Sequence, residues 1–264
     1  MCNKHLLNSE SQNPLFLAEM SYRQIEEHLK RIPCLVVPLG GLETYGKSGM
    51  LGSAGICSSF ICRELSSRLN VICAPDIYYS CTGAFKAFPG CASIHHSTFI
   101  NFLMSICHGW LFQGFKRILF INSIPENNKH IDIVAQKINR LKKEDYIGYF
   151  DWQNNKSIGS FISKHISSNE LGRSQKSILS MAAFLKPKLF SEFNDNESYR
   201  LPDRGVYKRW EKRGRDPVKF RKLFPSGGTS EDPLGYDSSF GEELFGYILE
   251  ILEQEYSSFL KINP

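Results

Sequence analysis

Short apolar runs alternate with helix-like patterns along most of this chain. Each run is bounded by proline, glycine or polar residues, and a continuous apolar run is typical of a parallel strand that is covered on both faces. The predicted strands lie at residues 35–39, 71–75, 118–122 and 146–152, and a further strand-like piece opens residues 15–31. Since strands and helices alternate, we expect an α/β fold, a single layered domain with a mostly parallel sheet flanked by helices.

Apolar residues at helical spacing predict the helices between these strands. Ser21 is a suitable N-cap, and Gln24 three residues later completes a capping box before a helix of about ten residues. Further helices are expected at residues 56–68, 98–109, 132–143 and 241–260, and in a segment that stops near Lys186.

The length of 264 residues suits one large α/β domain. We divide it into a core at 14–190, a basic excursion at 191–226 and a closing C-terminal helix segment at 227–264. Hydrophobic residues make up 42% of the chain and charged residues 22%, which are ordinary values for a folded globular protein. No apolar run approaches the roughly 20 residues of a membrane helix, and the N-terminus lacks a signal-peptide core, so a cytoplasmic protein is expected.

The positive charge is concentrated in one segment. Residues 200–222 contain ten Lys and Arg against three acidic residues, whereas the whole chain has a formal net charge of +5. Such a segment could contact phosphates, an acidic partner or a sister subunit, or it could be only solvated. We favour a solvated or subunit-contact role over nucleic-acid binding, because no nucleic-acid-binding module accompanies the charge.

The eight cysteines all lie in the first 107 residues and form no CxxC pair. Their scatter through predicted strands and helices indicates small buried side chains in a reducing compartment. Disulfides or a zinc site are the less favoured alternatives.

Polar residues follow two of the predicted strands where those strands end. The strand that ends at Leu39 is followed by Glu43, Thr44, Tyr45 and Lys47. The strand that ends at Asn122 is followed by Glu126, Asn127 and Asn128. Ligands of open α/β sheets bind at the carboxyl ends of the strands. We therefore expect both groups at one ligand-binding edge.

Several motifs, in order, resemble the creatininase (creatinine amidohydrolase) family from about Leu35 to the last helix. Its first motif, Pro-x-Gly-x-x-Glu-x-His-Gly, is represented by Pro38, Gly40, Glu43, Tyr45 and Gly46. The later matches are Phe88, Pro89 and Gly90, then 114–122, Gly172, Ser177, Asp232, Pro233 and Gly241.

The resemblance implies a two-metal hydrolase, usually with zinc or manganese, that opens a cyclic amide with a metal-activated water. It also implies cyclic oligomers, so a homo-oligomer is expected. Such a site needs about five N and O ligands. Glu43 and Glu126 match ligand positions, whereas Tyr45, Ala54 and Ile124 stand where the family has His, Asp and His. Glu170 stands at the proton-transfer histidine and Gln175 at a glutamate.

Alanine and isoleucine cannot coordinate a metal, and a neutral tyrosine is a poor ligand. We therefore expect no cofactor, with zinc or manganese only if other residues rebuild the site, for which Asp76, His95 and His96 are the candidates. Nucleophilic catalysis through Cys81, Cys91 or Ser123 is a further alternative, although no Gly-x-Ser-x-Gly elbow is present.

Two functions follow from these residues. The favoured one is a metal-free pseudoenzyme that binds a small-molecule ligand or a protein partner and contacts no membrane. Nucleic-acid binding through residues 200–222 is ranked last. The alternative is an active amidohydrolase that uses Glu43, Glu126 and Glu170, the last two as catalytic groups and Glu43 and Glu126 as remnants of the metal site. The expected ligand-binding residues are Tyr45, Lys47, Asn122, Ser123, Asn127 and Gln175.

Overall fold

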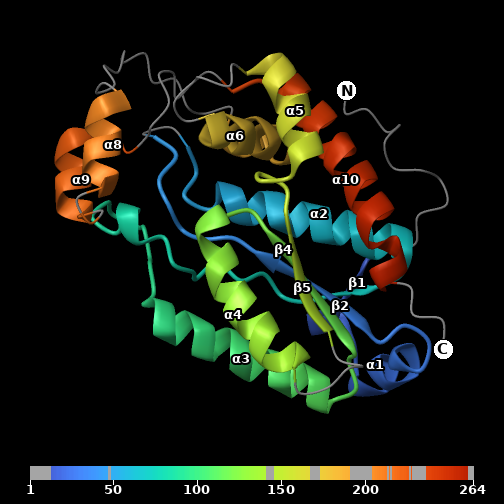
Figure 1. Ribbon diagram of the computed structural model, residues 1–264. Helices are drawn as coiled ribbons and strands as arrows, with labels where there is room; N and C mark the ends of the chain where they lie inside the picture. Colours follow the sequence, from blue (N-terminus) through green and yellow to red (C-terminus); the bar gives the residue numbers. More distant parts are fainter. Residues whose placement is uncertain are drawn as a thin grey trace.

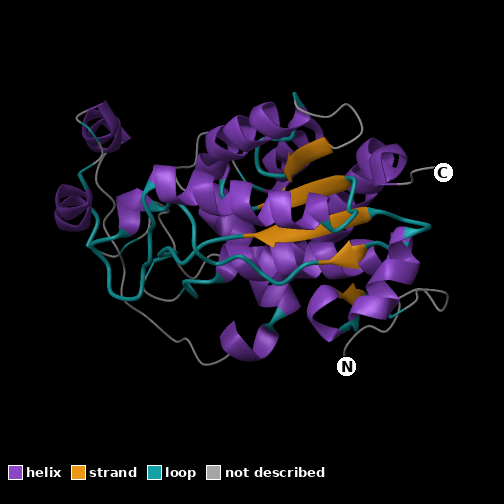
Figure 2. Cartoon of the chain, turned by 90° about the horizontal axis from the view of Figure 1, so that it is seen from below, coloured by secondary structure: helices purple, strands orange, loops and turns teal. Residues whose placement is uncertain are grey.

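The computed structural model shows a five-stranded, fully parallel sheet in the order β1-β3-β2-β4-β5 (Figures 1 and 2). The strands are β1 (Leu15–Phe16), β2 (Cys34–Leu39), β3 (Ile72–Cys73), β4 (Arg117–Asn122) and β5 (Tyr146–Asp151). The predicted α/β class and all five strand positions are confirmed. The structure describes residues 13–46, 49–140, 146–166, 173–190, 204–212, 214, 216–225, 227 and 236–260.

Helices cover both faces of the sheet (Figure 1). One face is covered by α2 (Ser53–Leu69), α5 (Lys156–His165), α6 (Arg173–Leu185) and α10 (Ser238–Leu260). The other face is covered by α1 (Tyr22–Leu29), α3 (His96–Phe112) and α4 (Asn128–Asn139).

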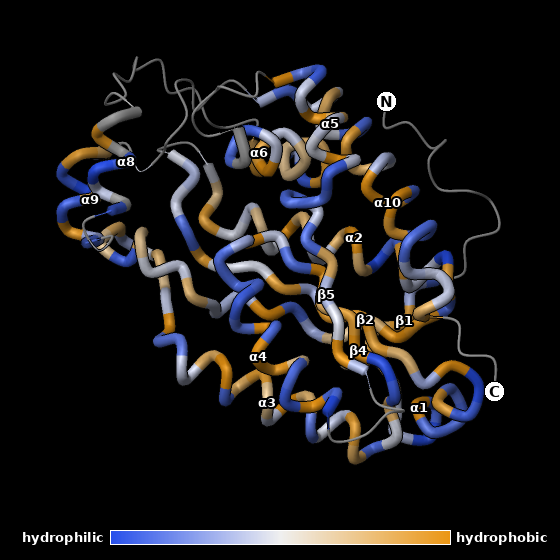
Figure 3. Tube along the Cα trace, in the orientation of Figure 1, coloured by the Kyte–Doolittle hydropathy of each residue, from blue (hydrophilic) through white to orange (hydrophobic). Residues whose placement is uncertain are grey.

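Strand β2 lies in the middle of this sandwich, and each of its six residues is buried. Successive side chains of a strand point to opposite faces, so Val36 joins the core under α2 while Leu35 and Val37 join the core under α3 and α4. Figure 3 shows the hydrophobic residues concentrated along these central strands. Burial on both faces explains why β2 reads as a continuous apolar run rather than an alternating one.

Every predicted helix is present, but the bounds of α4 differ and several short helices were not predicted. The capping box at Ser21 and Gln24 is present at the start of α1. Helix α4 runs from Asn128 to Asn139, earlier than the predicted 132–143. The side chain of Asn139 ends the helix by donating to the carbonyl of Ile147 in β5 and accepting from its N–H group. Helix α5 was missed, although Asn155 caps it by accepting from two backbone N–H groups.

The basic segment contains two helices, α8 (Arg204–Lys212) and α9 (Pro217–Leu223), which we call the basic module. Trp210, Phe220 and Phe224 are buried in a small aromatic cluster with Phe85 and Phe88, next to the short helix η2 (Gly83–Phe85). This segment is therefore docked on the domain, in part by its own core. The division at residues 190 and 226 stays a prediction.

The remaining short elements are η1 (Leu17–Glu19), η3 (Pro125–Asn127) and α7 (Pro187–Phe190). Among the described residues, no helix is both long enough and apolar enough to span a bilayer.

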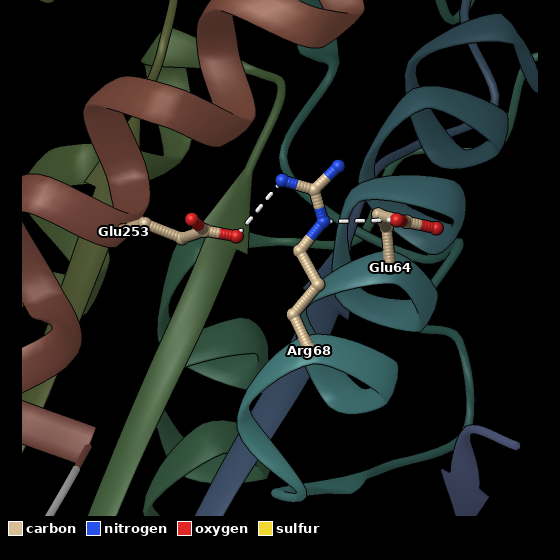
Figure 4. Close-up of polar contacts among 3 residues, drawn as sticks. All are labelled: Glu64, Arg68 and Glu253. Carbon is tan, nitrogen blue, oxygen red and sulfur yellow. Dashed lines mark hydrogen bonds and ion pairs between the residues drawn. The ribbon is translucent and has the colours of Figure 1, made fainter. Parts of the chain in front are cut away.

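An ion-pair bridge joins α2 to the C-terminal helix α10 (Figure 4). Arg68 contacts Glu64 in its own helix and Glu253 in α10, both at 2.9 Å. About a third of each of the side chains of Arg68 and Glu253 is exposed, so water screens the interaction. We expect Arg68→Met to lower the free energy of unfolding by at most ~1 kcal/mol in urea titrations, with a smaller loss in high salt.

Lys30→Met is the matched control for this bridge, because the ion pair between Lys30 and Glu27 is mostly exposed and joins residues of the same turn. A loss well above ~1 kcal/mol for Arg68→Met, unaffected by salt, would show that the bridge fixes α10 in place rather than merely adding to its packing.

Candidate functional site

The loop after β2 is pressed against the start of α2. A Cβ on Gly40 would lie 2.5 Å from the backbone nitrogen of Gly55 and would overlap its Cα. Only a glycine at position 40 permits this contact, which fixes the loop that carries Glu43 and Tyr45 over the N-terminal turn of α2. The edge expected from the strand ends is therefore formed.

Glu43 and Tyr45 form a buried hydrogen-bonded pair at this edge. The Tyr45 hydroxyl donates to Oε1 of Glu43 at 2.6 Å. The side chains of both residues are buried, with relative exposures of 9% for Glu43 and 1% for Tyr45. Among the described residues, none forms an ion pair with the Glu43 carboxyl.

Burial is the largest influence on the pKa of both groups in this pair, and it raises both values. It raises the pKa of Glu43 to about 8 against the opposing effect of the Tyr45 hydrogen bond, and the negative charge of Glu126 raises it further. Burial and the Glu43 carboxyl also raise the pKa of Tyr45 well above its ordinary value. At neutral pH both groups are therefore mainly protonated, and Tyr45 is a neutral donor.

Apolar side chains occupy two other positions of the edge. Ile124 is 1% exposed, and its Cδ1 lies 2.5 Å from the place where a Cβ on Gly41 would be. Ala54, in the first turn of α2, is fully buried. Neither side chain has an atom that can bind a metal.

The residues present do not fit the two-metal site that the family resemblance implies. Ala54 and Ile124 supply no donor atom, and Tyr45 would have to lose a proton whose pKa is raised. Within the described part of the chain, no group of three or more His, Cys, Asp or Glu side chains is placed to hold a metal ion.

Three of the expected ligand-binding residues are fully buried and hydrogen-bonded within the protein. Asn122 donates to the Ile124 carbonyl and to Asn128, and accepts from Asn127. The Ser123 hydroxyl accepts from Trp152 at 2.9 Å and shares a hydrogen bond with Ser58 at 2.7 Å. The side-chain oxygen of Asn127 accepts from the backbone of Cys81. These bonds fix the loop after β4, and ligand contact by these residues stays a prediction.

The remaining predicted residues are divided between this edge and places outside it. Glu126 is exposed in η3, close enough for its charge to affect Glu43, and Gln175 donates to the carbonyl of Thr44 at 3.3 Å. The edge thus unites Glu43, Tyr45, Glu126 and Gln175. Lys47, Glu170, Gly172, Asp232 and Pro233 lie outside the described residues.

The alternative chemistries have weaker support at this edge. His95 and His96 are exposed at the start of α3, with their rings 3.9 Å apart, and His95 caps that helix. Asp76 is exposed and accepts from the hydroxyl of Ser59. Burial raises the pKa of Cys91 to about 11 and also raises that of Cys81, which lowers the thiolate fraction that a nucleophile needs.

One contact at the edge was not anticipated from the sequence. Gly227 has a φ of +79°, and a Cβ there would overlap Oγ1 of Thr44 and lie 3.2 Å from the ring of Phe88. The chain just after the basic module therefore reaches the loop that carries Glu43. The sequence signal is the glycine pair at 227 and 228, which indicates a turn but not the residue it contacts.

Comparison with known proteins adds family and fold relationships. A family model described as creatinine amidohydrolase matches residues 18–254. A crystal structure of creatinine amidohydrolase has a TM-score of 0.73 at 16% identity, over 96% of this chain and 100% of that one. A creatininase structure with manganese in its description has a TM-score of 0.70 at 17% identity, over 92% and 99% of the two chains. At these identities the structures show the fold alone.

A curated relative is the 3-dehydro-scyllo-inosose hydrolase of Thermotoga maritima, which is 22% identical over 114 residues. The match covers 43% of this chain and only 37% of that protein.

Proposed function

This chain belongs to the creatininase family, and we propose that it acts by binding a ligand or partner rather than by metal-dependent hydrolysis. The hydrogen bond between Tyr45 and Glu43 carries the proposal. In the family pattern these two positions hold metal ligands. Here a neutral hydroxyl satisfies the glutamate, and the pKa of Glu43 is about 8, which favours its protonated form at neutral pH.

The apolar residues at the edge support the same proposal. A carboxylate at position 54 and an imidazole at position 124 would have to replace Ala54 and Ile124, both of which are packed in the core. Restoring a two-ion site would place several charged or polar groups in a region that is now close-packed and apolar, at a high cost in desolvation.

The bound molecule is proposed to carry negative charge. Among the side chains of the basic module that the structure describes, six are exposed cations, while Asp216, whose carboxylate caps α9, pairs with Lys219 at 3.8 Å. Gly227 connects this module to Thr44 beside Glu43. The exposed cations are Lys208, Arg209, Lys212, Lys219, Arg221 and Lys222. A small anionic ligand or an acidic protein partner would meet this charge beside the loop that carries Thr44 and Glu43.

Elemental analysis tests the metal part of the proposal. We expect protein purified with zinc or manganese, then passed through gel filtration, to hold well below one ion per chain. An active creatininase treated in parallel is the control, since it should retain its ions. About two tightly held ions per chain would overturn the proposal.

A second candidate function rests on one observation. A protonated Glu43 near the charged Glu126 resembles the carboxyl pairs that divide acid and base roles between them. An amidohydrolase of this kind would open a lactam or cyclic imide without a metal.

Hydrolysis assays separate the two functions. On a panel of lactams and cyclic imides, we expect wild type, Glu43→Gln and Glu126→Gln to give the same background rate. A rate above background that either substitution reduces by about tenfold or more would favour the hydrolase.

A further inference from the structure

A hollow lies between α1 and the residue that ends α2. Its volume is about 530 Å³, within the ~300–1,000 Å³ typical of small-molecule sites. Its polar lining is formed by Arg23, Gln24, Glu27, His28, Arg31 and Asn70. Figure 1 shows α1 and the basic module at opposite ends of the molecule. The hollow is therefore separate from the edge that carries Glu43, with which it shares no residue.

Most of this lining is a polar stripe along one side of α1. Gln24, His28 and Arg31 follow one another at intervals of four and three residues, which is the spacing of neighbours on one side of a helix. Ile25 and Leu29 pack instead into the core under α3 and α4. The side of α1 that lines the hollow is thus polar by sequence, although it includes a residue that is buried.

That residue, His28, lacks a hydrogen-bond partner for one of its ring nitrogens. It is 4% exposed, and no described residue forms a hydrogen bond with its Nε2 atom. Burial lowers the pKa of His28 and the charge of Arg31 lowers it further, against a hydrogen bond to the backbone of Asn70 that raises it. The ring is therefore mainly neutral at pH 7. Because a buried polar atom without a partner is costly, a ligand that bonds to Nε2 would recover free energy.

Two cations beside His28 determine the charge of the ligand. Arg23 and Arg31 are exposed, and among the described residues no carboxylate forms an ion pair with either of them. Glu27, the carboxylate in the described lining, pairs with Lys30 at 2.6 Å. Positions 23 and 31 are about 12 Å apart along a helix, so the two side chains can approach one small group from opposite sides. Guanidinium groups bind phosphate and carboxylate oxygens, and the hollow therefore favours a small oxyanion.

We propose that this hollow binds a phosphate group, with Arg23 and Arg31 donating to its oxygens and His28 taking up a proton at Nε2 on binding. Three donors at different positions along the helix suit the tetrahedral oxygens of a phosphate better than the two oxygens of a carboxylate. The proton comes from the solvent, because the negative charge of the ligand favours the charged imidazolium. The inference does not depend on the proposed function of the edge that carries Glu43.

Calorimetric titration of the full chain tests the class of ligand, with inorganic phosphate, glycerol 3-phosphate and succinate at neutral pH and constant ionic strength. Wild type should bind both phosphates with a Kd of about 1 mM or below, and succinate about tenfold more weakly. Tighter binding of glycerol 3-phosphate would support an organic phosphate as the ligand, and equal binding of the two would support free phosphate. Succinate that binds as tightly as either phosphate would overturn the proposal.

Charge-removing variants test the place of binding. Arg31→Gln should weaken phosphate binding by about tenfold or more, because it removes charge-assisted hydrogen bonds. Arg140→Gln is the matched control, because Arg140 is exposed at the end of α4 and lies outside the hollow. Equal binding by wild type and Arg31→Gln would overturn the proposal. A loss confined to Lys222→Gln would also overturn it, since the phosphate would then lie on the basic module.

Proton uptake tests the part played by His28. Sulfate is the probe, because it is a tetrahedral oxyanion that does not titrate near neutral pH. The other charged groups that line the hollow, Arg23, Glu27 and Arg31, do not titrate there either. Saturating sulfate should raise the pKa of His28 by about 1 or more, as followed by the proton NMR signal of its ring. His28→Gln assigns that signal by its absence, and a His28 pKa that sulfate leaves unchanged would contradict the proposal.

Discussion

Replacing Glu43 with glutamine should stabilise this protein in alkaline solution and remove much of the dependence of its stability on pH. Glutamine keeps the oxygen that accepts from the Tyr45 hydroxyl, but it cannot ionise. In the native protein the pKa of Glu43 is about 8, whereas its ordinary value is 4.5. The carboxyl therefore retains its proton in the folded state over a pH range in which the unfolded chain has lost it.

The direction of the effect follows from this difference. Well below pH 4.5 the Glu43 carboxyl is protonated in both states, so this group does not lower the free energy of unfolding. Between pH 4.5 and about 8 the native state binds more protons than the unfolded state, so the free energy of unfolding falls as the pH rises. One such group lowers it by at most about 1.4 kcal/mol per pH unit.

Urea titrations of wild type and Glu43→Gln at about pH 5, 7 and 9 measure this effect. The difference in free energy of unfolding should increasingly favour the variant as the pH rises. Glu126→Gln is the matched control, because Glu126 is exposed and should leave most of the pH dependence in place. A Glu43→Gln variant that is less stable than wild type at every pH would show that the charge of Glu43 is needed, as it would be beside a bound cation.

Gly40→Ala should be among the most destabilising single substitutions in this chain. The new Cβ would lie 2.5 Å from the backbone nitrogen of Gly55 and would overlap its Cα. Both atoms belong to the main chain, so no side-chain rotation relieves the contact, and the start of α2 must move away from the end of β2. We expect a loss of about 3 kcal/mol or more in the free energy of unfolding, or failure to obtain folded protein.

Gly159→Ala is the control for the intrinsic effect of alanine. Gly159 lies within α5, and a Cβ there would meet no atom within 4 Å. Alanine in a helix interior should raise the free energy of unfolding by roughly 0.5–1 kcal/mol. Thermal melting and urea titration of both variants measure the contrast, and a Gly40→Ala variant as stable as wild type would show that β2 and α2 can separate without cost.

Hydrophobic periodicity was sufficient for most of the secondary structure. A strand buried on both faces must be apolar throughout, so β2 and β4 could be located from sequence alone. The capping box at Ser21 is a local signal of the same reliability. Helix α5 was missed because it has only ten residues, and its Asn155 cap and two buried residues, Ile158 and Ile162, give a short periodic signal.

The basic segment combines exposed charge with a buried aromatic cluster. Its cations indicated a solvated or subunit-contact role, which stays a prediction, but they gave no sign that Trp210, Phe220 and Phe224 are buried together. The partner rings, Phe85 and Phe88, lie far away in the chain. A small aromatic core formed by distant residues leaves no periodic signal in either segment.

The sequence by itself determined the fold class, the sheet edge and the identity of the residues at the family's ligand positions. The sequence gives the residue types at positions 45, 54 and 124 as Tyr45, Ala54 and Ile124. The atoms of these side chains then decide whether each can bind a metal. Only the tertiary structure decided that Tyr45 donates to Glu43, that burial keeps Glu43 protonated, and that Gly227 touches Thr44. Hydrophobic pattern is a local property of the chain, whereas hydrogen bonding, desolvation and close backbone approach depend on distances that folding sets between residues far apart in sequence.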